Sequence, residues 1–261
     1  MRLAHLLGAS LLLSVVSAEA PAQDMLRNVD LAQPAYSQSE FTRADIEARL
    51  AATKPGETLD LSMRSLNGLD LSGLDLSGVN LRAARLVKAR LAGARLDGAI
   101  LDQAWLLEAD LSGASLRGAH VFATQLQRAR AEGADFSKSR LAADLTGADL
   151  RGALFRGADM SADMKNQSMG LMRAVLRSAK LDGAHFDGAD LSRADMRYAR
   201  APGAIFDKAS LKDVDAAGAD FTGARFEGVS AEGLSLDSVR IDRGAAATLK
   251  GAVDLDRAYL Q

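Results

Sequence analysis

The side chains that enzymes use for chemistry form no recognisable catalytic pattern in this sequence. The 261 residues contain no cysteine, which excludes thiol nucleophiles, thiolate metal ligands, disulfides and a lipid-modified N-terminal cysteine. Of the three histidines, His5 lies in an apolar N-terminal run, and neither His120 nor His185 belongs to an obvious constellation with serine and aspartate. No phosphate-binding glycine loop and no metal-ligand spacing is present. We therefore predict no catalytic residue, no cofactor and no metal site, and we expect the protein not to be an enzyme.

The composition argues against two further classes of protein. The net charge is −2, whereas a general nucleic-acid binder normally carries a basic stripe, so no nucleic-acid partner is expected. Hydrophobic residues make up 48% of the chain, which argues against a disordered acidic protein. Aromatic residues are only 5%, so the core must be built from smaller side chains than usual. Repetition is the simplest way to do this.

The N-terminus has the pattern of a secretory signal peptide, which we assign to residues 1–22. Arg2 precedes an apolar run, Leu6–Val16, and small residues follow it. The run is shorter than the roughly 20 apolar residues that span a bilayer. Cleavage after Ala18 is preferred to cleavage after Ala22, because a proline interrupts the second motif. We expect a periplasmic or secreted protein with no transmembrane segment after cleavage; an apolar helix that stays attached is the alternative.

Residues 23–58 are predicted to hold a linker and a short N-terminal capping helix. The sequence is polar and irregular from about Gln23 to Ser39, as is typical of a linker. A helix is predicted from Thr42 to Ala52, because Thr42 and Asp45 have the spacing of a capping box. Pro55, followed by glycine, ends it.

A five-residue repeat fills most of the remaining chain. A large residue, usually leucine, recurs at every fifth position over the ranges Leu61–Leu141, Leu145–Met160 and Leu176–Ile241. The residue two positions before each of these centres is usually alanine, and a glycine often follows two positions after. A period of five matches neither the 3.6 of an amphipathic helix nor the 2 of an ordinary strand.

These units resemble the pentapeptide-repeat family, whose unit reads Ala-(Asp or Asn)-Leu followed by two variable residues. Ala148–Gly152 reads Ala-Asp-Leu-Arg-Gly, and Ala189–Arg193 reads Ala-Asp-Leu-Ser-Arg. The resemblance covers nearly all of Leu59–Ile241. It implies an all-β solenoid, a right-handed quadrilateral parallel β-helix with four units in each coil. It also implies that the centre and the residue two before it point inward, while the other three point outward.

The dimensions of such a solenoid follow from the strand spacing. With coils stacked about 4.8 Å apart, residues 59–243 make about nine coils and a rod on the order of 40 Å long. Alternating large and small inward residues fill the interior without voids. A repeat stack needs its ends covered, and the Thr42–Ala52 helix is the expected lid at the N-terminal end.

Two register breaks are predicted, at residues 142–144 and 161–175. The step from Leu141 to Leu145 is one residue short, and the step from Met160 to Leu176 is one residue longer than three units. We predict a kink or bulge in the rod at the second break, with a protruding binding loop as the alternative.

Residues 244–261 are predicted to form a C-terminal cap. The pattern breaks between Gly244 and Gly251, after which Leu255 and Leu260 restore the five-residue spacing with Val253 in a small inward position. We expect a loop followed by a final half-coil.

Charged residues alternate in sign at one outward position of successive coils. Residues twenty apart stack on one face, and opposite charges there contribute about 0.2–1 kcal/mol per pair. A ladder that sets the register of the coils is predicted, with ordinary solvated charges as the alternative. Asp75 and Arg95 repeat the pattern on the neighbouring face. The ladder residues are Asp70, Arg90, Asp110, Arg130 and Asp149.

Several apolar residues also fall at outward positions of three consecutive coils. An exposed apolar cluster marks a contact surface, so these residues are predicted to bind a partner. Alternatively, the segment 23–60 covers them, or they are scattered surface residues with no role. They are Val87, Ile100, Trp105, Leu107 and Phe122.

Three functions fit these observations. The first is an exported structural or protein-interaction module of the cell envelope, whose flat faces meet an unknown protein or a second copy. The second is a DNA-mimicking regulator of DNA gyrase, a role that the family resemblance implies for some cytoplasmic members; it needs a surface of one sign, which the ladder opposes. The third is a binder of envelope glycans or small ligands, for which Trp105 is the main aromatic platform.

Overall fold

The computed structural model describes residues 30–31, 33–164 and 172–261. The chain divides into two compact units, Met1–Leu31 and Ala32–Gln261. The signal peptide predicted at residues 1–22 lies outside the described residues, and so does the central part, 165–171, of the second register break. Within the described ranges, no helix has both the length and the apolar character needed to cross a membrane.

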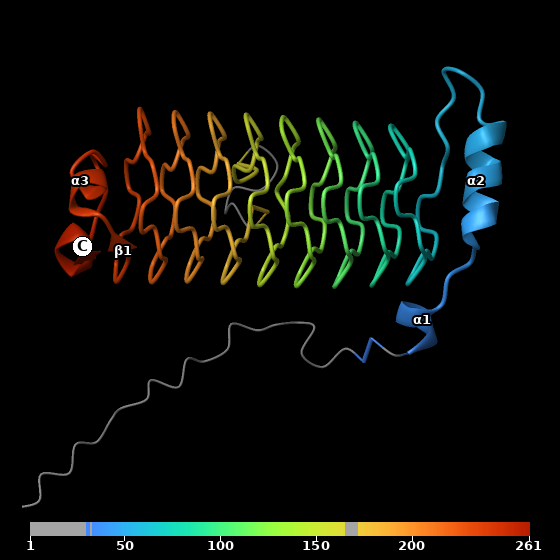
Figure 1. Ribbon diagram of the computed structural model, residues 1–261, viewed down its shortest axis with the longest axis horizontal. Helices are drawn as coiled ribbons and strands as arrows, with labels where there is room; N and C mark the ends of the chain where they lie inside the picture. The colour runs from blue at the N-terminus through green and yellow to red at the C-terminus, as the bar shows by residue number, and fades with distance from the viewer. Residues whose placement is uncertain (1–29, 32, 165–171) are drawn as a thin grey trace, which may run out of the picture. The chain divides into compact units, whose positions relative to one another are not determined.

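The second unit contains a parallel β-helix of stacked coils (Figure 1). Each of its four faces carries a column of parallel bridges, in which one residue pairs with its equivalent one coil later. The columns start at Asp60, Ser65, Asp70 and Asp75, and we name the faces A, B, C and D in that order. Most bridges, such as Asp60↔Asn80, join residues twenty positions apart, as the repeat predicts.

Regular strand is scarce in the described part of this solenoid. Its strands are β1 (Arg240–Ile241) and β2 (Tyr259–Leu260), which pair in parallel. Elsewhere each face contributes a single bridge residue per coil, because a turn follows most centres within two residues. The predicted all-β character therefore consists mainly of bridges and turns.

Backbone hydrogen bonds explain why five residues make one face. The Leu71 N–H donates to the Arg90 carbonyl of the next coil at 2.7 Å, and the Leu74 N–H donates to the Leu71 carbonyl at 3.2 Å, which closes a turn. Gly73, two positions after the centre, has a φ of 69°, in the left-handed region that glycine adopts without steric cost. The glycine that often follows two positions after a centre therefore lies at the corner between two faces.

Alanine and a larger apolar side chain alternate in the interior. Pairs such as Ala89 and Leu91 are fully buried along the stack. On face D the centres change to phenylalanine in the C-terminal coils, and each ring stacks on the next with centroids 4.8–5.2 Å apart. Such pairs add about 0.5–1.5 kcal/mol each to the burial of the rings. The stacked rings are Phe136, Phe155, Phe186, Phe206 and Phe226.

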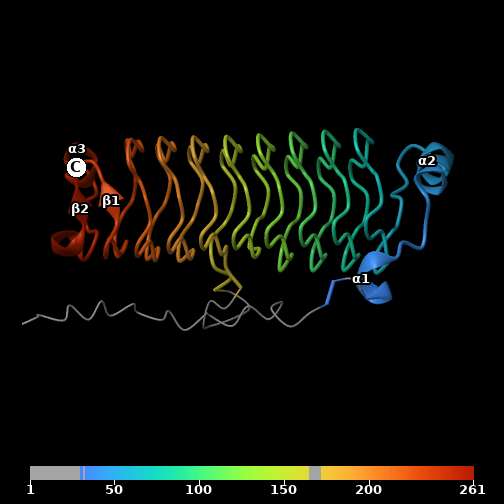
Figure 2. The same ribbon diagram turned by 60° about the horizontal axis from the view of Figure 1, so that its bottom comes forward.

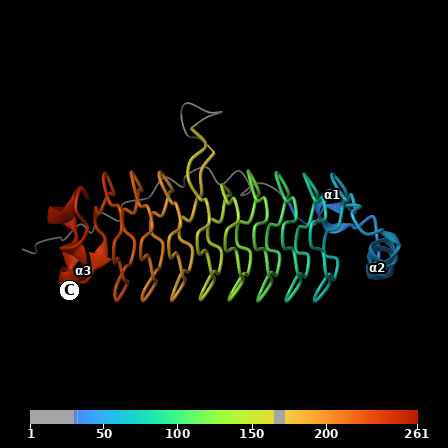
Figure 3. The same cartoon turned by 90° about the horizontal axis from the view of Figure 1, so that it is seen from above.

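Both predicted register breaks are visible in the bridge spacing. The Arg140↔Asp159 bridge joins residues one position closer than usual, whereas Asp144↔Val175 spans eleven residues more than a regular coil. The extra residues leave the stack at the corner between faces A and B, and Figure 3 shows their described limbs rising from its side. The Asp159↔Asp190 bridge continues the column beyond this insertion. The second break therefore inserts eleven residues between two bridged positions of the stack, and its central residues, 165–171, lie outside the described part of the chain.

Two helices precede the first coil. Helix α1 (Pro34–Ser37) leads to an antiparallel Ser39↔Leu66 bridge. Helix α2 (Arg43–Ala52) begins after Thr42, whose capping box with Asp45 is formed as the sequence predicts. Figures 1 and 2 show α2 at the end of the stack, where Ile46 is fully buried within the hydrophobic core.

The C-terminal segment differs in part from its prediction. Helix α3 (Arg243–Ala246) and the short helix η1 (Leu255–Arg257) precede β2, which adds the expected partial coil beside β1. Val253 bridges Ser235 and therefore occupies an outward bridge position, not the predicted small inward one. The predicted centres Leu255 and Leu260 are 38% and 36% exposed, and Leu255 lies in η1 rather than on a face of a coil.

Candidate interaction site

The five apolar residues predicted as a partner-binding surface do not form an exposed cluster. Val87 and Leu107 are fully buried, and Ile100, Trp105 and Phe122 are half-buried. The prediction was wrong in treating outward positions of the repeat as accessible positions.

The segment before the first coil supplies part of the physical reason. Tyr36 of α1 stacks on Trp105 with ring centroids 5.8 Å apart and planes 10° from parallel. The Gln38 carbonyl accepts a hydrogen bond of 2.5 Å from the Ser65 hydroxyl, which fixes this segment against face B. On face A the guanidinium of Arg140 lies 4.9 Å from the centre of the Phe122 ring. The contact of Tyr36 with Trp105 agrees with the alternative that the chain's own 23–60 segment covers the cluster.

The charge ladder lies on face C, where parallel bridges connect its five residues in order. Arg90 forms an ion pair with Asp70 at 2.9 Å, and Arg130 forms one with Asp110 at 3.6 Å. On face D, Arg95 pairs with Asp75 at 3.3 Å. Asp149 pairs instead with Arg151 on its own coil at 2.7 Å and with Lys180 on the next at 3.5 Å.

The ladder aspartates also stabilise the turns. The Asp70 carboxylate accepts a hydrogen bond of 3.0 Å from the Ser72 N–H, and Asp110 accepts one of 3.1 Å from the Ser112 N–H. The hydrogen bonds from Arg90 and Ser72 hold the pKa of Asp70 well below its usual range. These pairs are exposed, and exposed pairs contribute little to stability.

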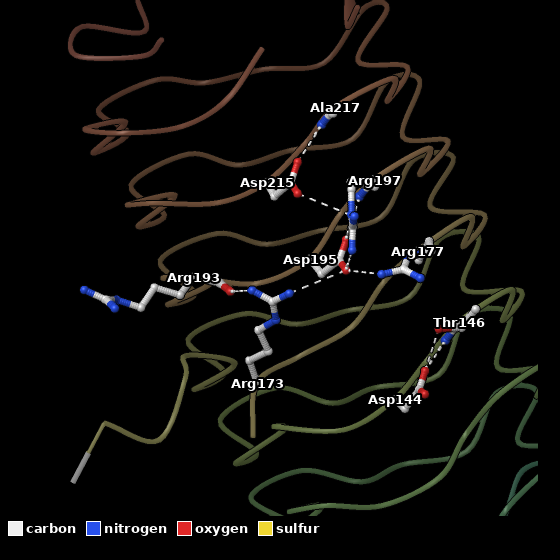
Figure 4. Close-up of polar contacts among 9 residues, drawn as sticks. All are labelled: Asp144, Thr146, Arg173, Arg177, Arg193, Asp195, Arg197, Asp215 and Ala217. Carbon is white, nitrogen blue, oxygen red and sulfur yellow. Dashed lines mark hydrogen bonds and ion pairs between the residues drawn. The ribbon is translucent and has the colours of Figure 1, made fainter. Parts of the chain in front are cut away.

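Face B carries a different arrangement, in which several arginines surround one buried carboxylate (Figure 4). The Asp195 side chain is only 1% exposed. Its Oδ2 lies 2.6 Å from Arg197 Nη2, 2.7 Å from Arg177 Nη2 and 3.7 Å from Arg173 Nη2. Arg197 Nε also donates to Asp195 Oδ1 at 2.9 Å and lies 3.3 Å from Asp215 Oδ2. We call Arg173, Arg177, Arg197 and Asp195 the arginine cluster.

The arginines decide the ionisation of the buried group. Burial alone raises the pKa of Asp195, but the hydrogen bonds from Arg197 and Arg177 outweigh it and lower the pKa to about 2. The same contact raises the pKa of Arg197 above its ordinary value. Asp195 is therefore a carboxylate at any physiological pH.

Repeat and insertion both contribute to the cluster. Arg177 and Arg197 follow the centres Leu176 and Met196 on consecutive coils, and Asp195 bridges Val175 and Asp215 in the column of face B. Arg173 comes from the returning limb of the insertion, and its Nη1 also donates to the Arg193 carbonyl at 3.4 Å.

The base of the insertion is held at a second point. The Asp163 N–H donates to the Met172 carbonyl at 2.9 Å, which joins the two limbs. The buried Asp163 carboxylate lies 3.6 Å from Arg140 Nη2. Of the exposed apolar side chains, Met164 lies on the outgoing limb and Tyr198 directly follows Arg197, at 42% and 49% exposure.

His185 is surrounded by charged side chains. His185 lies 3.2 Å from an Arg156 nitrogen and 3.4 Å from Asp187, with no serine at the contact. No group of three or more His, Cys, Asp or Glu side chains in the described ranges could hold a metal ion. A pocket of about 420 Å³ beside α3 is lined partly by Phe226, Val229 and Ala245.

The arginine cluster was not predicted from the sequence, although the spacing of three of its residues indicates it. Arg177 and Arg197 are twenty residues apart, and Asp195 occupies the position just before a centre. The register alone therefore places these three side chains on one face. Arg173 could not be placed in this way, because it lies within the second register break.

Comparison with known proteins identifies the repeat. A sequence model described as "Pentapeptide repeats" matches in eight copies over residues 65–103, 104–142, 122–161, 171–207 and 203–233. No curated protein matched the chain.

Solved structures of similar proteins come from several sources. HetL, a pentapeptide-repeat protein involved in heterocyst differentiation regulation from the cyanobacterium Nostoc sp. strain PCC 7120, is 29% identical, with 84% of this chain and 92% of HetL covered and a TM-score of 0.31. QnrB1, a plasmid-mediated fluoroquinolone resistance protein, is 18% identical, with 79% and 81% covered and a TM-score of 0.37. A thylakoid-lumen pentapeptide-repeat protein from Arabidopsis thaliana is 19% identical, with 77% and 83% covered and a TM-score of 0.16.

The family match covers more than half of the chain and coincides with the coils of the β-helix. The five-residue unit, the four columns of bridges and the inward alanine and leucine positions all describe the same repeat. The chain therefore belongs to the pentapeptide-repeat family, and its coils form the right-handed β-helix solenoid of that family.

Proposed function

We propose that this protein is a non-enzymatic interaction module, exported to the cell envelope, that presents the faces of a rigid rod of about nine coils to a partner protein. One observation carries the proposal. The inside of the solenoid is filled by a continuous apolar cluster, and its charged side chains stand outside at fixed positions along the columns. A ligand would therefore meet the outer faces.

Helix α2 and the arginine cluster support the same proposal. With Ile46 buried in the core, α2 acts as a lid that keeps the first coil from pairing with another chain. The arginine cluster holds ordered guanidiniums and is followed in the chain by the exposed Tyr198, and both arginine and tyrosine are enriched in protein interfaces. Export rests on the signal-peptide pattern of residues 1–22.

The first experiment locates the protein and its mature N-terminus. Cell fractionation followed by intact-mass measurement is expected to find a processed periplasmic or secreted form that begins near Glu19 or Gln23. An unprocessed cytoplasmic form would contradict export. Inhibition and protection of DNA gyrase in vitro would then test the DNA-mimic alternative.

The second experiment tests the interaction itself. A photo-crosslinking amino acid is introduced in living cells at one exposed position on each of two opposite sides of the rod, for example at Tyr198 beside face B and at Arg225 on face D. We expect one protein adduct that forms from one side and not from the other. Equal labelling from both sides, or no adduct from either, would contradict a defined docking face.

A further inference from the structure

We propose that the arginine cluster binds a carboxylate of an acidic segment in a partner protein. The inference rests on the proposed function. It places the binding site on the part of face B between Arg173 and Tyr198, and it names a carboxylate as the group that is bound. Acidic motifs are commonly recognised by groups of arginines.

The charges at this location do not balance. Arg173, Arg177 and Arg197 face the two carboxylates of Asp195 and Asp215, which leaves one excess positive charge. Within the described ranges, Nε and Nη1 of Arg177 and Nη1 of Arg197 have no hydrogen-bond acceptor. The arginine side chains are 25–35% exposed, so these donors can be reached from solvent.

The cluster is also ordered before any ligand arrives. Asp195 holds the inner ends of the guanidiniums, and the Arg193 carbonyl holds Arg173 from a second direction. Fixing an arginine side chain costs conformational entropy. In a preformed site this entropy is lost on folding, so binding of the ligand does not lose it again. The Nη2 of Arg177 uses one of its two hydrogens for Asp195, and its second hydrogen together with the neighbouring Nε or Nη1 leaves one guanidinium edge that matches a carboxylate in a bidentate geometry.

Two carboxylates favour a singly charged ligand over a dianion. Asp195 is shared by the three arginines, and Asp215 contacts Arg197 directly. Both are negative, so they repel a phosphate dianion more strongly than a carboxylate. One excess positive charge likewise suits one acidic side chain.

Apolar groups at the edges indicate that the ligand belongs to a polypeptide. Tyr198 follows Arg197, and Met164 lies on the limb that is joined to Met172, next to Arg173. Arginine, tyrosine and methionine are enriched in protein interfaces. The expected ligand is an acidic side chain with apolar neighbours.

A synthetic peptide tests this site directly. A fluorescein-labelled peptide of alternating glutamate and leucine is titrated with the full-length protein and followed by fluorescence anisotropy. The matched probe contains glutamine in place of glutamate. We expect the glutamate peptide to bind and the glutamine peptide to bind about tenfold more weakly.

Variants assign any binding to the cluster. Arg177→Gln is expected to weaken binding of the glutamate peptide about tenfold, whereas the matched change Arg130→Gln on face C leaves it unchanged. Asp215→Asn removes a competing carboxylate and is expected to tighten binding a few-fold. Circular dichroism confirms that each variant is folded, and Arg177→Lys, which keeps the charge but not the bidentate geometry, replaces Arg177→Gln if that variant unfolds.

Several results would overturn the inference. These are equal effects of Arg177→Gln and Arg130→Gln, weaker binding by Asp215→Asn, or displacement of the peptide by inorganic phosphate more effectively than by acetate at equal ionic strength. If the peptide does not bind but a crosslinked partner is found in cells, the acidic site is wrong and the interaction module stands. If the peptide binds but no adduct forms in cells, the acidic site stands and the proposed cellular function does not.

Discussion

The charge ladder and the arginine cluster are two ion-pair systems built on the same repeat. Asp70 and Asp195 occupy the same position in their units, directly before a centre, and each carboxylate accepts a hydrogen bond from the N–H two residues later. In the ladder, Arg90 and Asp70 meet as an exposed pair. In the cluster, the guanidiniums close over one carboxylate that is almost fully buried.

The difference shows what the repeat alone can and cannot build. The repeat places a carboxylate at a bridge position and lets equivalent side chains of neighbouring coils meet, which is sufficient for the ladder. Burial of Asp195 needs arginines just after the centres of two consecutive coils, and the insertion adds Arg173. A buried, shared carboxylate therefore requires a departure from regularity.

The largest effect that separates the two systems is expected from Asp195→Asn. The change removes a buried charge and leaves Arg173 and Arg177 without their counter-ion, so we expect a loss of about 3 kcal/mol in the free energy of unfolding. Urea denaturation at neutral pH, followed by circular dichroism, measures this loss.

Asp190→Asn is the matched control for that variant. Asp190 lies on the same coil at the equivalent position of face A, is exposed, and accepts a hydrogen bond from the Ser192 N–H at 2.9 Å. The expected cost is below about 1 kcal/mol. Equal losses in the two variants would mean that burial of Asp195 has no energetic importance.

The next effect concerns pH. The pKa of Asp195 is about 2 in the folded protein, below its ordinary value of 3.8, so its ionisation stabilises the fold fully above pH 4 and loses this contribution as the pH falls towards 2. The contribution is about 2 kcal/mol. Measured from pH 6 to pH 2, the stability difference between the native protein and Asp195→Asn should shrink from about 3 to about 1 kcal/mol. A constant difference would show that Asp195 is not ionised in the way its contacts require.

The sequence predicted the regular part of this fold because the period of five carries the register. Leu61, Gly73 and Asp70 each sit where the repeat places them, and the Thr42–Asp45 capping box needs only local spacing. Adding twenty to a residue number gives its neighbour in the next coil, so the order of the ladder was readable as well.

Accessibility was less predictable because it depends on segments outside the repeat. Trp105 points outward, but Tyr36, almost seventy residues earlier, stacks on it, and no period relates the two. The face on which Arg173 lies could not be assigned from the repeat, because Arg173 belongs to an insertion. The apolar surface was therefore misjudged, and the arginine cluster was missed, at positions where non-repeating segments meet the coils.

The smallest effect is expected from Arg90→Gln in the ladder. Arg90 is 61% exposed and pairs with Asp70, so its loss should lower the free energy of unfolding by less than about 1 kcal/mol. The effect should fall further as salt is raised from about 0.01 to 1 M, because the screening length shortens from about 30 to 3 Å. Asp195→Asn should keep most of its cost over the same range, because a buried group is screened much less. Parallel urea titrations of the two variants at both salt concentrations measure this contrast, and a loss that is equally salt-sensitive in both would show that the cluster behaves as an ordinary surface ladder.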